Sequence, residues 1–229
     1  MDHDITLHPI GWVESVFKEK FGAPRQSGVV PSATGVIHFY PPYDQPDAFA
    51  ELEGFSHLWV VSQFHLVPDD GGFRPKVRPP KLGGSKKVGV FASRAPFRPN
   101  RLCLSVVKLE EVEIEKSAVS LRVSGLDMVD GTPVLDIKPY LPYADARPEA
   151  VTAYGLAHNP ELIVIPERPE VYDGLSAEDL LLIEQTLRAQ PQPAYSAADH
   201  QFGVTLAGWN VVWKTQEDRI VITEIKKKN

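Results

Sequence analysis

The chain has 229 residues, of which 43% are hydrophobic and 24% are charged, a composition typical of a folded protein with one or two domains. No run approaches the roughly eighteen consecutive apolar residues of a membrane helix. The polar start of the chain also lacks the features of a signal peptide. The single cysteine, Cys103, excludes an internal disulfide and cannot dominate a metal site. We therefore expect a cytoplasmic protein with no membrane partner and no metal.

The net charge of −6 is unevenly distributed along the chain. Residues 71–109, the basic segment, contain no Asp or Glu and hold ten Lys and Arg residues, which leaves −16 for the rest of the chain. A local basic surface on an acidic protein suits a polyanion that must bind at one place. A solvated loop with scattered cations is the alternative. We favour a polyanion site because the unbalanced charges would otherwise repel one another.

Residues 1–150 predict short strands that Pro, Gly or charged clusters separate. The expected strands are residues 10–13, 36–39, 58–64, 88–91, 104–114, 119–123 and 134–137. In the longest of them, a break in the alternation at Glu110 and Glu111 predicts a bulge. One short helix is expected at residues 47–53, between Pro46 and Gly54. About seven strands with few helices indicate an all-β barrel or sandwich.

A proline-containing stretch without clear periodicity, residues 144–170, predicts a boundary. Beyond it, Ser176 and Asp179 form a capping signal for a helix whose apolar stripe continues to about residue 190. Residues 202–209, 211–213 and 220–225 then predict a small antiparallel sheet, and residues 226–228 a solvated lysine tail. The expected fold is mainly β with an α+β addition: a β-barrel over residues 1–150 and a small α+β domain over residues 170–229.

The common nucleotide-binding and hydrolase motifs are missing from the sequence. It contains no G-x-G-x-x-G, no G-x-x-x-x-G-K-[ST] and no G-x-S-x-G, which disfavours a doubly wound nucleotide-binding fold and Ser-His-Asp hydrolysis. His57 and His65 could share one face of a strand, but no Cys or close carboxylate completes a zinc ligand set.

Four segments stand out because most of them pair an apolar run with a polar loop that a nearby proline stiffens. They are residues 17–26, 55–65, 89–100 and 125–140. Proline fixes φ and lowers the entropy lost on ordering, so such loops hold polar groups in place. Turn chemistry explains any one of these loops equally well, but four in one domain favour a preorganised site.

The four segments resemble the signature stretches of the tRNA-methyltransferase O family, also described as TrmO or TsaA-like. The third has the pattern G-V-F-A-[ST]-R-x-P-F-R-P-N and the fourth contains D-G-T-P-V-L-D-I-K-P-Y, while looser matches occur at residues 192–195 and 210–213. The resemblance implies a small β-barrel that binds S-adenosylmethionine as a homodimer. It also implies methylation of N6 of N6-threonylcarbamoyladenosine next to the anticodon of tRNA (t6A to m6t6A).

The resemblance further implies which positions bind the cofactor. Carried over onto this chain, they are Pro24, Arg25, Gln26, His65, Leu66, Arg94, Leu104, Ser124, Gly125, Leu126 and Asp127. One departure follows the third motif, where the family often continues R-P-N-P-I-G and this chain has Arg101, Leu102 and Cys103 after Asn100. We expect this departure to alter the wall of the methyl-acceptor pocket without removing the activity.

The implied reaction assigns roles to the charged residues. The acceptor N6 is part of a urea and a poor nucleophile, so we expect Asp127 or Asp130 to act as the catalytic base. Asp130 precedes Gly-Thr-Pro and is equally explained as a turn former. Main-chain carbonyls near Asp127, or its carboxylate, could favour the sulfonium or accept from the ribose hydroxyls. Arg94 could hold the cofactor carboxylate through a bidentate fork.

The tRNA anticodon stem-loop is the expected partner. The expected substrate-binding residues are Arg98, Asn100, Lys138, Lys86 and Lys87. Among them, Arg98 and Lys138 are candidates for the threonyl carboxylate, and the rest of the basic segment would hold phosphates. Phe97 or Tyr140 could stack on the exposed base, although Phe97 is equally a candidate core residue.

Two other functions remain open from the residues alone. A methyltransferase of a small anionic metabolite would turn over without tRNA. A non-catalytic barrel that binds RNA or a ligand would bind no cofactor and transfer no label.

Overall fold

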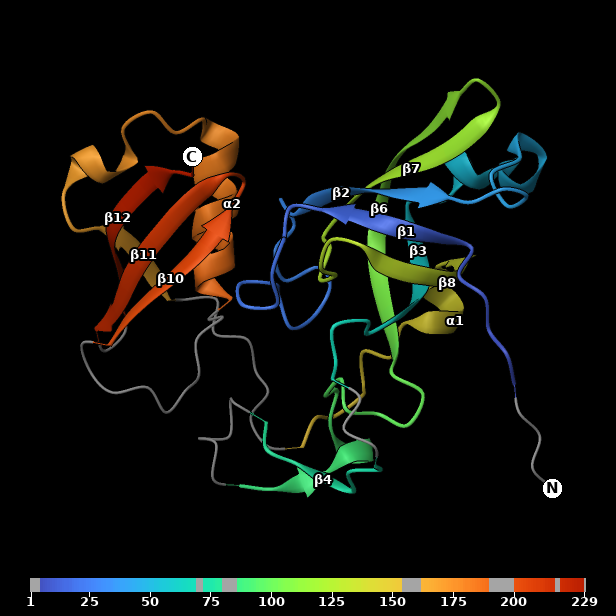
Figure 1. Cartoon of the computed structure of the whole chain (residues 1–229), viewed down its shortest axis with the longest axis horizontal. Coiled ribbons are helices and arrows are strands. Elements are labelled where there is room, and N and C mark those ends of the chain that lie inside the picture. Colours follow the sequence, from blue (N-terminus) through green and yellow to red (C-terminus); the bar gives the residue numbers. More distant parts are fainter. Residues whose placement is uncertain are drawn as a thin grey trace.

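The computed structural model describes residues 5–68, 72–79, 86–153, 162–189, 200–216 and 219–228. Two β-rich units lie side by side, and the N- and C-termini lie at opposite sides of the molecule (Figure 1). Among the described residues, no helix is long and apolar enough to cross a membrane.

The first unit is a closed barrel of antiparallel strands in the order β1-β2-β7-β6-β3-β8. The strands are β1 Gly11–Ser15, β2 Thr34–Phe39, β3 His57–Gln63, β6 Leu102–Glu115, β7 Ala118–Ser124 and β8 Thr132–Pro139. The prediction of a mainly β fold built on a barrel is confirmed.

Alternation along the strands fills the barrel, because every second side chain points inward. Fully buried interior residues come from every strand: Val13, Ile37, Leu58, Val60, Val107, Leu121, Val123 and Val134. The register between β6 and β7 shifts between Leu109 and Glu111, so the bulge predicted there is confirmed. The extra residue restores the inward alternation and lets the long β6 bend around the barrel.

The single helix expected at residues 47–53 is wrong. Two short 3₁₀ turns stand there, η1 Pro46–Phe49 and η2 Leu52–Gly54. Between them Ala50 has a ψ of 133° and Glu51 a left-handed φ of 65°, which interrupt the helical hydrogen bonding.

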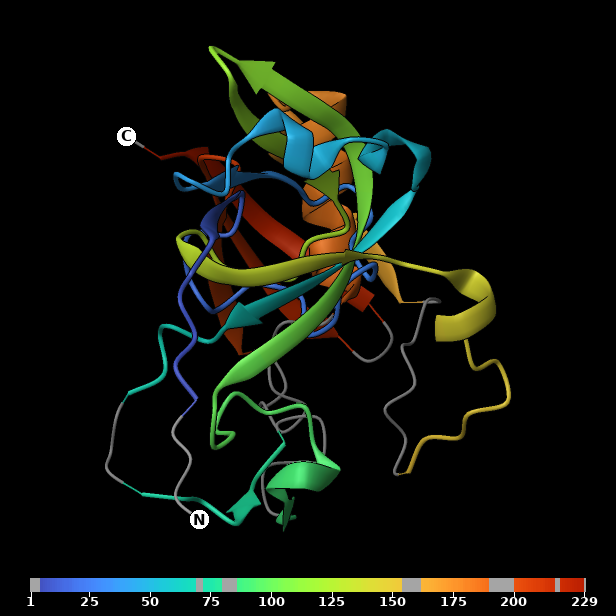
Figure 2. The ribbon, with the colours of Figure 1, turned by 90° about the vertical axis from the view of Figure 1, so that its right-hand side faces the viewer.

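The long connection from β3 to β6 carries a small lobe built on a two-stranded ribbon. Its strands are β4 Lys76–Val77 and β5 Val88–Gly89, followed by the 3₁₀ turn η4 Val90–Ala92. The strand expected at residues 88–91 therefore ends early. In Figures 1 and 2 this lobe projects below the barrel.

The second unit is a four-stranded sheet, in the order β10-β11-β12-β9, that packs on one helix. Its elements are β9 Ile163–Pro166, η5 Pro169–Tyr172, α2 Ala177–Arg188, β10 Gln201–Leu206, β11 Trp209–Gln216 and β12 Arg219–Lys227. The helix prediction is confirmed, since the Ser176 hydroxyl accepts the N–H of Asp179 at 3.0 Å. After β8 the chain forms one helical turn, α1 Pro142–Asp145, and then reaches β9.

Three features of the second unit differ from the sequence expectations. Ala207 and Gly208, with φ of 48° and 78°, form a turn that divides the strand expected at residues 202–209. The lysines at 226 and 227 belong to β12 rather than to a tail, and Trp209 pairs with Lys227. The strand β9, which pairs with β12 in parallel, was not predicted and lies inside the stretch 144–170.

The motif at residues 192–195 and Lys81 lie outside the described residues.

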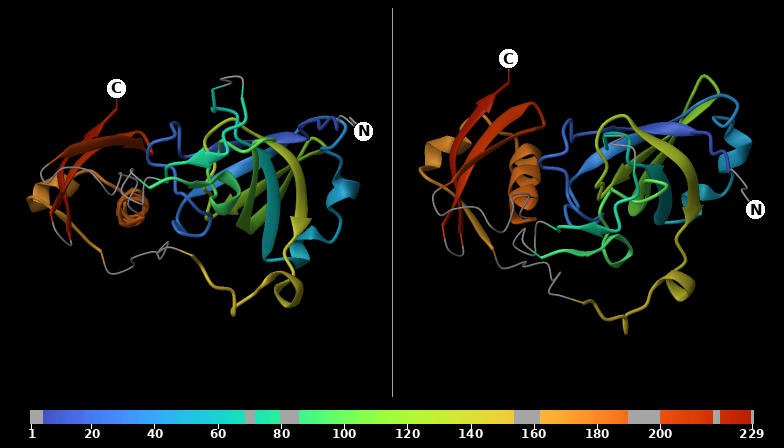
Figure 3. Two further views of the ribbon diagram at one scale, coloured as in Figure 1. Left: turned by 90° about the horizontal axis from the view of Figure 1, so that it is seen from below. Right: turned by 60° about the horizontal axis from the view of Figure 1, so that its bottom comes forward.

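The loop between β1 and β2 joins the two units (Figure 3). The Phe21 ring stacks on Trp213 with centroids 5.9 Å apart. The carboxylate of Glu19 accepts the N–H of Thr205 at 3.1 Å, and Ser32 donates its hydroxyl to Gln185 at 2.8 Å. One side of this loop is therefore fixed by the second unit, while its other side faces the end of the barrel.

Candidate active site

Three connections emerge from the same end of the barrel, which we call the site rim. They are residues 16–33 between β1 and β2, residues 64–101 between β3 and β6, and residues 125–131 between β7 and β8. Antiparallel pairing brings them together, because Thr34 at the start of β2 pairs with Ser124 at the end of β7. Likewise Gln63, at the end of β3, pairs with Leu102 at the start of β6. The four segments that the sequence singled out contribute to this rim.

The inside of the barrel changes from apolar to polar at the site rim. Among the described residues, the buried polar side chains of the barrel all lie near this end: Ser15, Ser62, Ser105, Ser124 and Thr132. A hydroxyl group that is buried without a hydrogen bond costs free energy. Apolar packing inside a barrel does not require such groups. Their concentration at one end marks a place where the fold holds polar chemistry.

Asp127 occupies the centre of this polar end. The Ser105 hydroxyl donates a hydrogen bond of 2.6 Å to Oδ1 of Asp127. Burial raises the pKa of the Asp127 carboxyl, and the Ser105 hydrogen bond and the positive charge of Arg94 oppose that rise. The side chain is therefore a carboxylate held in one orientation and more basic than an ordinary aspartate.

Cys103 lies on the same side of β6 as Ser105 and is close to Asp127 in the β7–β8 turn. Its Sγ is 3.7 Å from the Ser105 hydroxyl. Burial, and then the charge of Asp127, raise the pKa of the thiol, while contacts with Ser105 and Ser62 and the charge of Arg94 lower it. This thiol occupies the position where glycine is common in the resembled family, so it adds bulk next to the carboxylate.

Arg101 begins the turn into β6 with a left-handed φ of 53°. A proline, whose ring fixes φ near −65°, could not adopt this conformation. The departure from the family pattern at this position therefore changes the path of the backbone as well as the side chain.

The loop that carries Pro24, Arg25 and Gln26 lies directly against the turn after β7. The N–H of Gly28 donates to the carbonyl of Gly125 at 2.9 Å, and the Ser27 hydroxyl accepts the N–H of Val106 at 3.0 Å. Gly125 has a φ of 73°, and a side chain there would meet Gly28 at 3.4 Å, so only glycine suits this approach of two backbones.

The side chains of this loop are oriented inward. Pro24 is buried, and burial lowers the pKa of Arg25. The buried Oε1 of Gln26 has no hydrogen-bond partner among the described residues. An unsatisfied buried acceptor costs free energy, so Gln26 fits a site that a ligand with a hydrogen-bond donor completes.

The end of β3 brings His65 and Leu66 to the same rim. A side chain added at Gly131 would come within 3.9 Å of Nε2 of His65, which places the imidazole over the β7–β8 turn. Burial lowers the pKa of His65. Lys20 donates to the carbonyl of Leu66 at 3.2 Å and so links this strand end to the β1–β2 loop. Leu66 and Leu104 are both exposed apolar side chains.

Asp130 lies in the same turn as Asp127 but in a different environment. Its carboxylate accepts the N–H of Ser15 at 2.9 Å and pairs with Nζ of Lys18 at 3.0 Å. Burial alone would raise the pKa of Asp130, but the Ser15 hydrogen bond and Lys18 outweigh it and lower the pKa. Through these contacts, Asp130 anchors the β7–β8 turn to the end of β1.

The residues expected to bind the substrate do not all lie together. Arg98 is half-buried and donates to the carbonyl of Ser93 at 2.7 Å, whereas Asn100, Lys86 and Lys87 are exposed. Lys138 pairs with Trp59 on β3 and lies six residues beyond the start of β8. At about 3.3 Å per residue, that is roughly 20 Å along the strand from the site rim.

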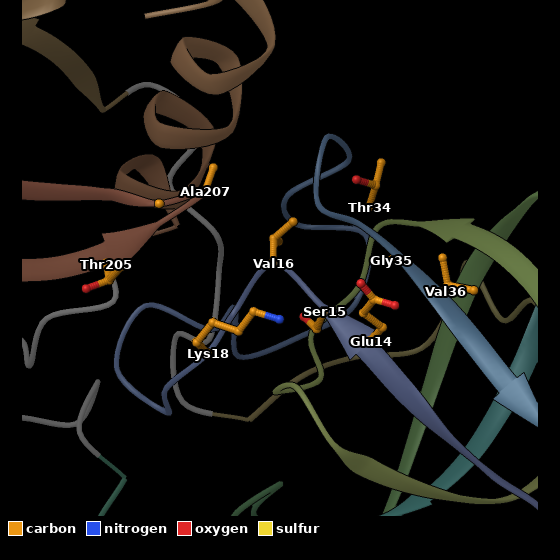
Figure 4. A pocket seen from close by; sticks show the side chains of 10 residues that line it. Glu14, Ser15, Val16, Lys18, Thr34, Gly35, Val36, Thr205 and Ala207 are labelled. Atoms are coloured by element: carbon orange, nitrogen blue, oxygen red, sulfur yellow. The ribbon is translucent and has the colours of Figure 1, made fainter. Parts of the chain in front are cut away.

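A separate hollow of about 360 Å³ lies between the outside of the barrel and the second unit (Figure 4). Its walls come from β1, β2 and the turn after β10, and include Lys18, Thr34 and Ala207. None of the expected cofactor-binding residues lines it. The hydrogen bonds that connect Asp127, Ser105 and the 24–28 loop therefore locate the candidate site better than this hollow does.

Comparison with known proteins assigns the family. The model of the tRNA-methyltransferase O N-terminal domain matches residues 12–146, and that of the TrmO C-terminal domain matches residues 168–228. The chain belongs to the tRNA-methyltransferase O family.

Individual relatives and solved structures agree with this family. The chain is 43% identical over 218 residues to the tRNA (adenine(37)-N6)-methyltransferase of Escherichia coli, covering 91% of this chain and 92% of the relative. It is 42% identical over 221 residues to a putative S-adenosylmethionine-dependent methyltransferase, RcsF, of Pseudomonas aeruginosa, covering 93% of both. A crystal structure of TrmO from P. aeruginosa superposes with a TM-score of 0.79 at 35% identity, covering 99% of both chains.

Sequence reasoning missed Ser105 and Ser27. Ser105 stands at an inward position of an otherwise apolar strand, so its alternation was a usable signal. Ser27 follows the recognised Pro-Arg-Gln loop and gave no signal of its own, because its contact with Val106 joins residues far apart in the chain.

Proposed function

We propose that the protein transfers a methyl group from S-adenosylmethionine to N6 of the adenine at position 37 of tRNA, with N6-threonylcarbamoyladenosine as the acceptor. The observation that carries this proposal is the basic, oriented carboxylate of Asp127 among the residues that the family implies for the cofactor. The activity for which the E. coli relative is named supports the reaction and the adenine.

The residues at the site rim fit this cofactor. The unsatisfied Oε1 of Gln26 suits a hydroxyl or amine donor, and the close backbone approach at Gly125 leaves main-chain carbonyls beside the Asp127 turn. Arg94 is exposed and close enough for its charge to act on Asp127 and Cys103, so its guanidinium can hold a carboxylate as a fork. Leu66 offers apolar surface for a base, whereas Leu104 pairs with Val61 on the outward face of β6 and stays a prediction from the sequence.

When bound, S-adenosylmethionine supplies an electrophilic methyl group on a sulfonium. The chain then has two tasks. It aligns acceptor and donor, which lowers the barrier by several kcal/mol, and it removes the N6 proton. The bound cofactor would supply the methyl group that N6 gains, and Asp127 would accept the proton that N6 loses. The raised pKa of Asp127 favours this transfer, because a base works best when its pKa approaches the working pH.

The basic segment supplies the substrate contacts in this proposal. Arg98, in the loop next to Arg94, is the candidate for the threonyl carboxylate, and Lys86 and Lys87 are exposed candidates for phosphates. Lys138 and Asp130 stay predictions from the sequence, and their contacts give them no role in this scheme. The homodimer that the family resemblance implies also stays a prediction, which sedimentation of the purified protein would test.

Labelled S-adenosylmethionine, supplied with tRNA that carries or lacks the threonylcarbamoyl group, tests the reaction. We expect label only in the modified tRNA. Label in both tRNAs would contradict the proposed acceptor, turnover without tRNA would indicate a small metabolite, and no transfer at all would indicate a non-catalytic barrel.

The cofactor assignment has its own test. We expect Arg94→Ala to weaken S-adenosylmethionine binding by about tenfold to a hundredfold, measured by calorimetry, because hydrogen bonds to charged groups contribute about 1.5–3 kcal/mol. Lys86→Ala is the matched control, since it removes an exposed cation from the same basic segment and is not one of the expected cofactor-binding residues. Equal affinities for the two variants would place the cofactor elsewhere.

A further inference from the structure

A group of aromatic rings and guanidinium groups is exposed on the lobe that follows β3; we call it the aromatic lobe. It consists of Phe73, Arg74, Phe91, Phe97 and Arg98. The rings of Phe73 and Phe91 stack with centroids 6.1 Å apart and an interplanar angle of 30°. The guanidinium of Arg98 lies 5.9 Å from the Phe91 ring, and that of Arg74 lies 4.8 Å from the Phe97 ring.

These rings are displayed to solvent. Phe91 is 70% exposed, Phe73 is 60% exposed and Phe97 is 36% exposed. Leaving phenyl rings in water forgoes roughly 25 cal/mol for each Å² of apolar surface that could be buried. A contiguous exposed apolar patch of this kind marks a binding surface more often than an accident of packing.

The lobe holds the rings in place although they are exposed. Val90 is buried beneath them, and its N–H donates to the carbonyl of Pro75 at 3.0 Å, which ties the two halves of the lobe together. The Ser93 hydroxyl donates to the carbonyl of Val90 at 2.8 Å, and Arg98 donates to the carbonyl of Ser93 at 2.7 Å. A ligand would therefore find the rings already ordered, which lowers the entropic cost of binding.

Charge decides which ligand fits. The basic segment around the rings contains no acidic residue. A second copy of this chain meeting the lobe through a two-fold contact would place these cations opposite themselves, and such a contact is unfavourable. Unpaired nucleotides match the surface, because every base has a face that stacks on an aromatic ring and every phosphate suits a nearby cation.

We propose that the aromatic lobe is a stacking platform for the unpaired nucleotides that flank the acceptor adenosine. This inference rests on the proposed function and adds the surface that the RNA loop contacts. The bases stack on Phe73 and Phe91, and Arg74 contacts their phosphates, while Arg98 keeps the threonyl carboxylate of the acceptor. The position of the lobe suits this role, since Arg98 and Arg94 belong to one short segment and the charge of Arg94 acts on Asp127.

The test compares two double variants of the full chain. Phe73→Leu with Phe91→Leu removes the rings but keeps apolar side chains and every charge, and Phe73→Tyr with Phe91→Tyr keeps the rings. The probe is an anticodon stem-loop RNA with 2-aminopurine in place of an unpaired base beside the acceptor position. Affinity, 2-aminopurine fluorescence and the salt dependence of binding are measured for each protein.

We expect the leucine variant to bind this RNA about tenfold more weakly or worse, and to lose the fluorescence quenching that the wild type and the tyrosine variant produce. Its salt dependence should equal that of the wild type, because no phosphate contact is removed. Its S-adenosylmethionine affinity should also be unchanged.

Two outcomes would overturn the inference. One is unchanged RNA affinity and quenching in the leucine variant. The other is a fall in its molecular mass in sedimentation, which would assign the lobe to an interface between copies. Failure of the proposed function looks different: the wild type itself would then neither bind the RNA nor transfer a methyl group to it.

Discussion

The two ends of the barrel differ in the side chains that line them. At the far end, β6 and β7 are joined by a tight turn at Lys116 and Ser117, whose φ values of 47° and 72° suit a two-residue hairpin. The interior there is closed by apolar packing, with the rings of Phe39 and Phe49 4.8 Å apart. At the site rim, by contrast, several buried side chains carry hydroxyl groups.

This difference separates stability from function within one barrel. The far end follows the rule that strands alternate apolar side chains inward, and among the described residues no buried polar side chain lies there. The site rim departs from that rule, because it holds the partly buried carboxylate of Asp127 and leaves Oε1 of Gln26 without a partner among the described residues. Proteins accept such costs at functional sites.

The largest effect is expected for Asp127→Asn. Loss of a catalytic base slows the chemical step by about a hundredfold to ten-thousandfold, measured as the single-turnover rate of methyl transfer to modified tRNA. Folding raises the pKa of Asp127, so its ionised form destabilises the native state at neutral pH. The variant should therefore unfold at a higher temperature than the wild type at pH 7, and this gain should shrink as the pH falls below the raised pKa.

Ser105 provides the companion variants for this test. Ser105→Ala removes the hydrogen bond that favours the ionised form of Asp127, so the acid limb of the pH–rate profile should move to higher pH. Ser105→Thr keeps a hydroxyl and should restore the limb toward the wild-type position. A purely structural role for Ser105 would lower the rate of both variants without moving the limb.

A smaller and opposite effect is expected for Asp130→Asn. Folding lowers the pKa of Asp130, so its charge contributes stability that is present above the unfolded pKa and is lost as the pH falls through the folded pKa. We expect the variant to lose about 1–2 kcal/mol of unfolding free energy at pH 7, measured by urea denaturation, and to approach the wild type in acid. Its methyl-transfer rate should stay within about threefold of the wild type. A fall as deep as that of Asp127→Asn would make Asp130 the base.

The smallest effect is expected for Lys138→Ala. This lysine lies on β8 toward the far end, so the rate and the tRNA affinity should change by less than about twofold, as for an ordinary surface substitution. Arg98→Ala is the comparison, with an expected loss of affinity for modified but not for unmodified tRNA. If Lys138→Ala instead weakened binding of modified tRNA, the threonyl group would extend along β8 and the division between the two ends would fail.

The sequence by itself determined most strands of the barrel, the capped helix and the segments that carry the chemistry. Alternation of apolar residues is a local property, and so are the Ser176 cap and the break at Glu110, so the order of residues was sufficient to place them. The family resemblance supplied the candidates for the cofactor site in the same way, residue by residue.

Only the tertiary structure decided which of these candidates is the catalytic base and which one anchors the turn. Asp127 and Asp130 are three residues apart in one polar turn, and nothing in that turn distinguishes a buried base from an ion-paired anchor. The distinction comes from Ser105 on β6 and from Ser15 and Lys18 at the end of β1, partners that barrel closure brings to the turn. A pKa depends on burial and neighbouring charge, and both are set by contacts between residues distant in the chain.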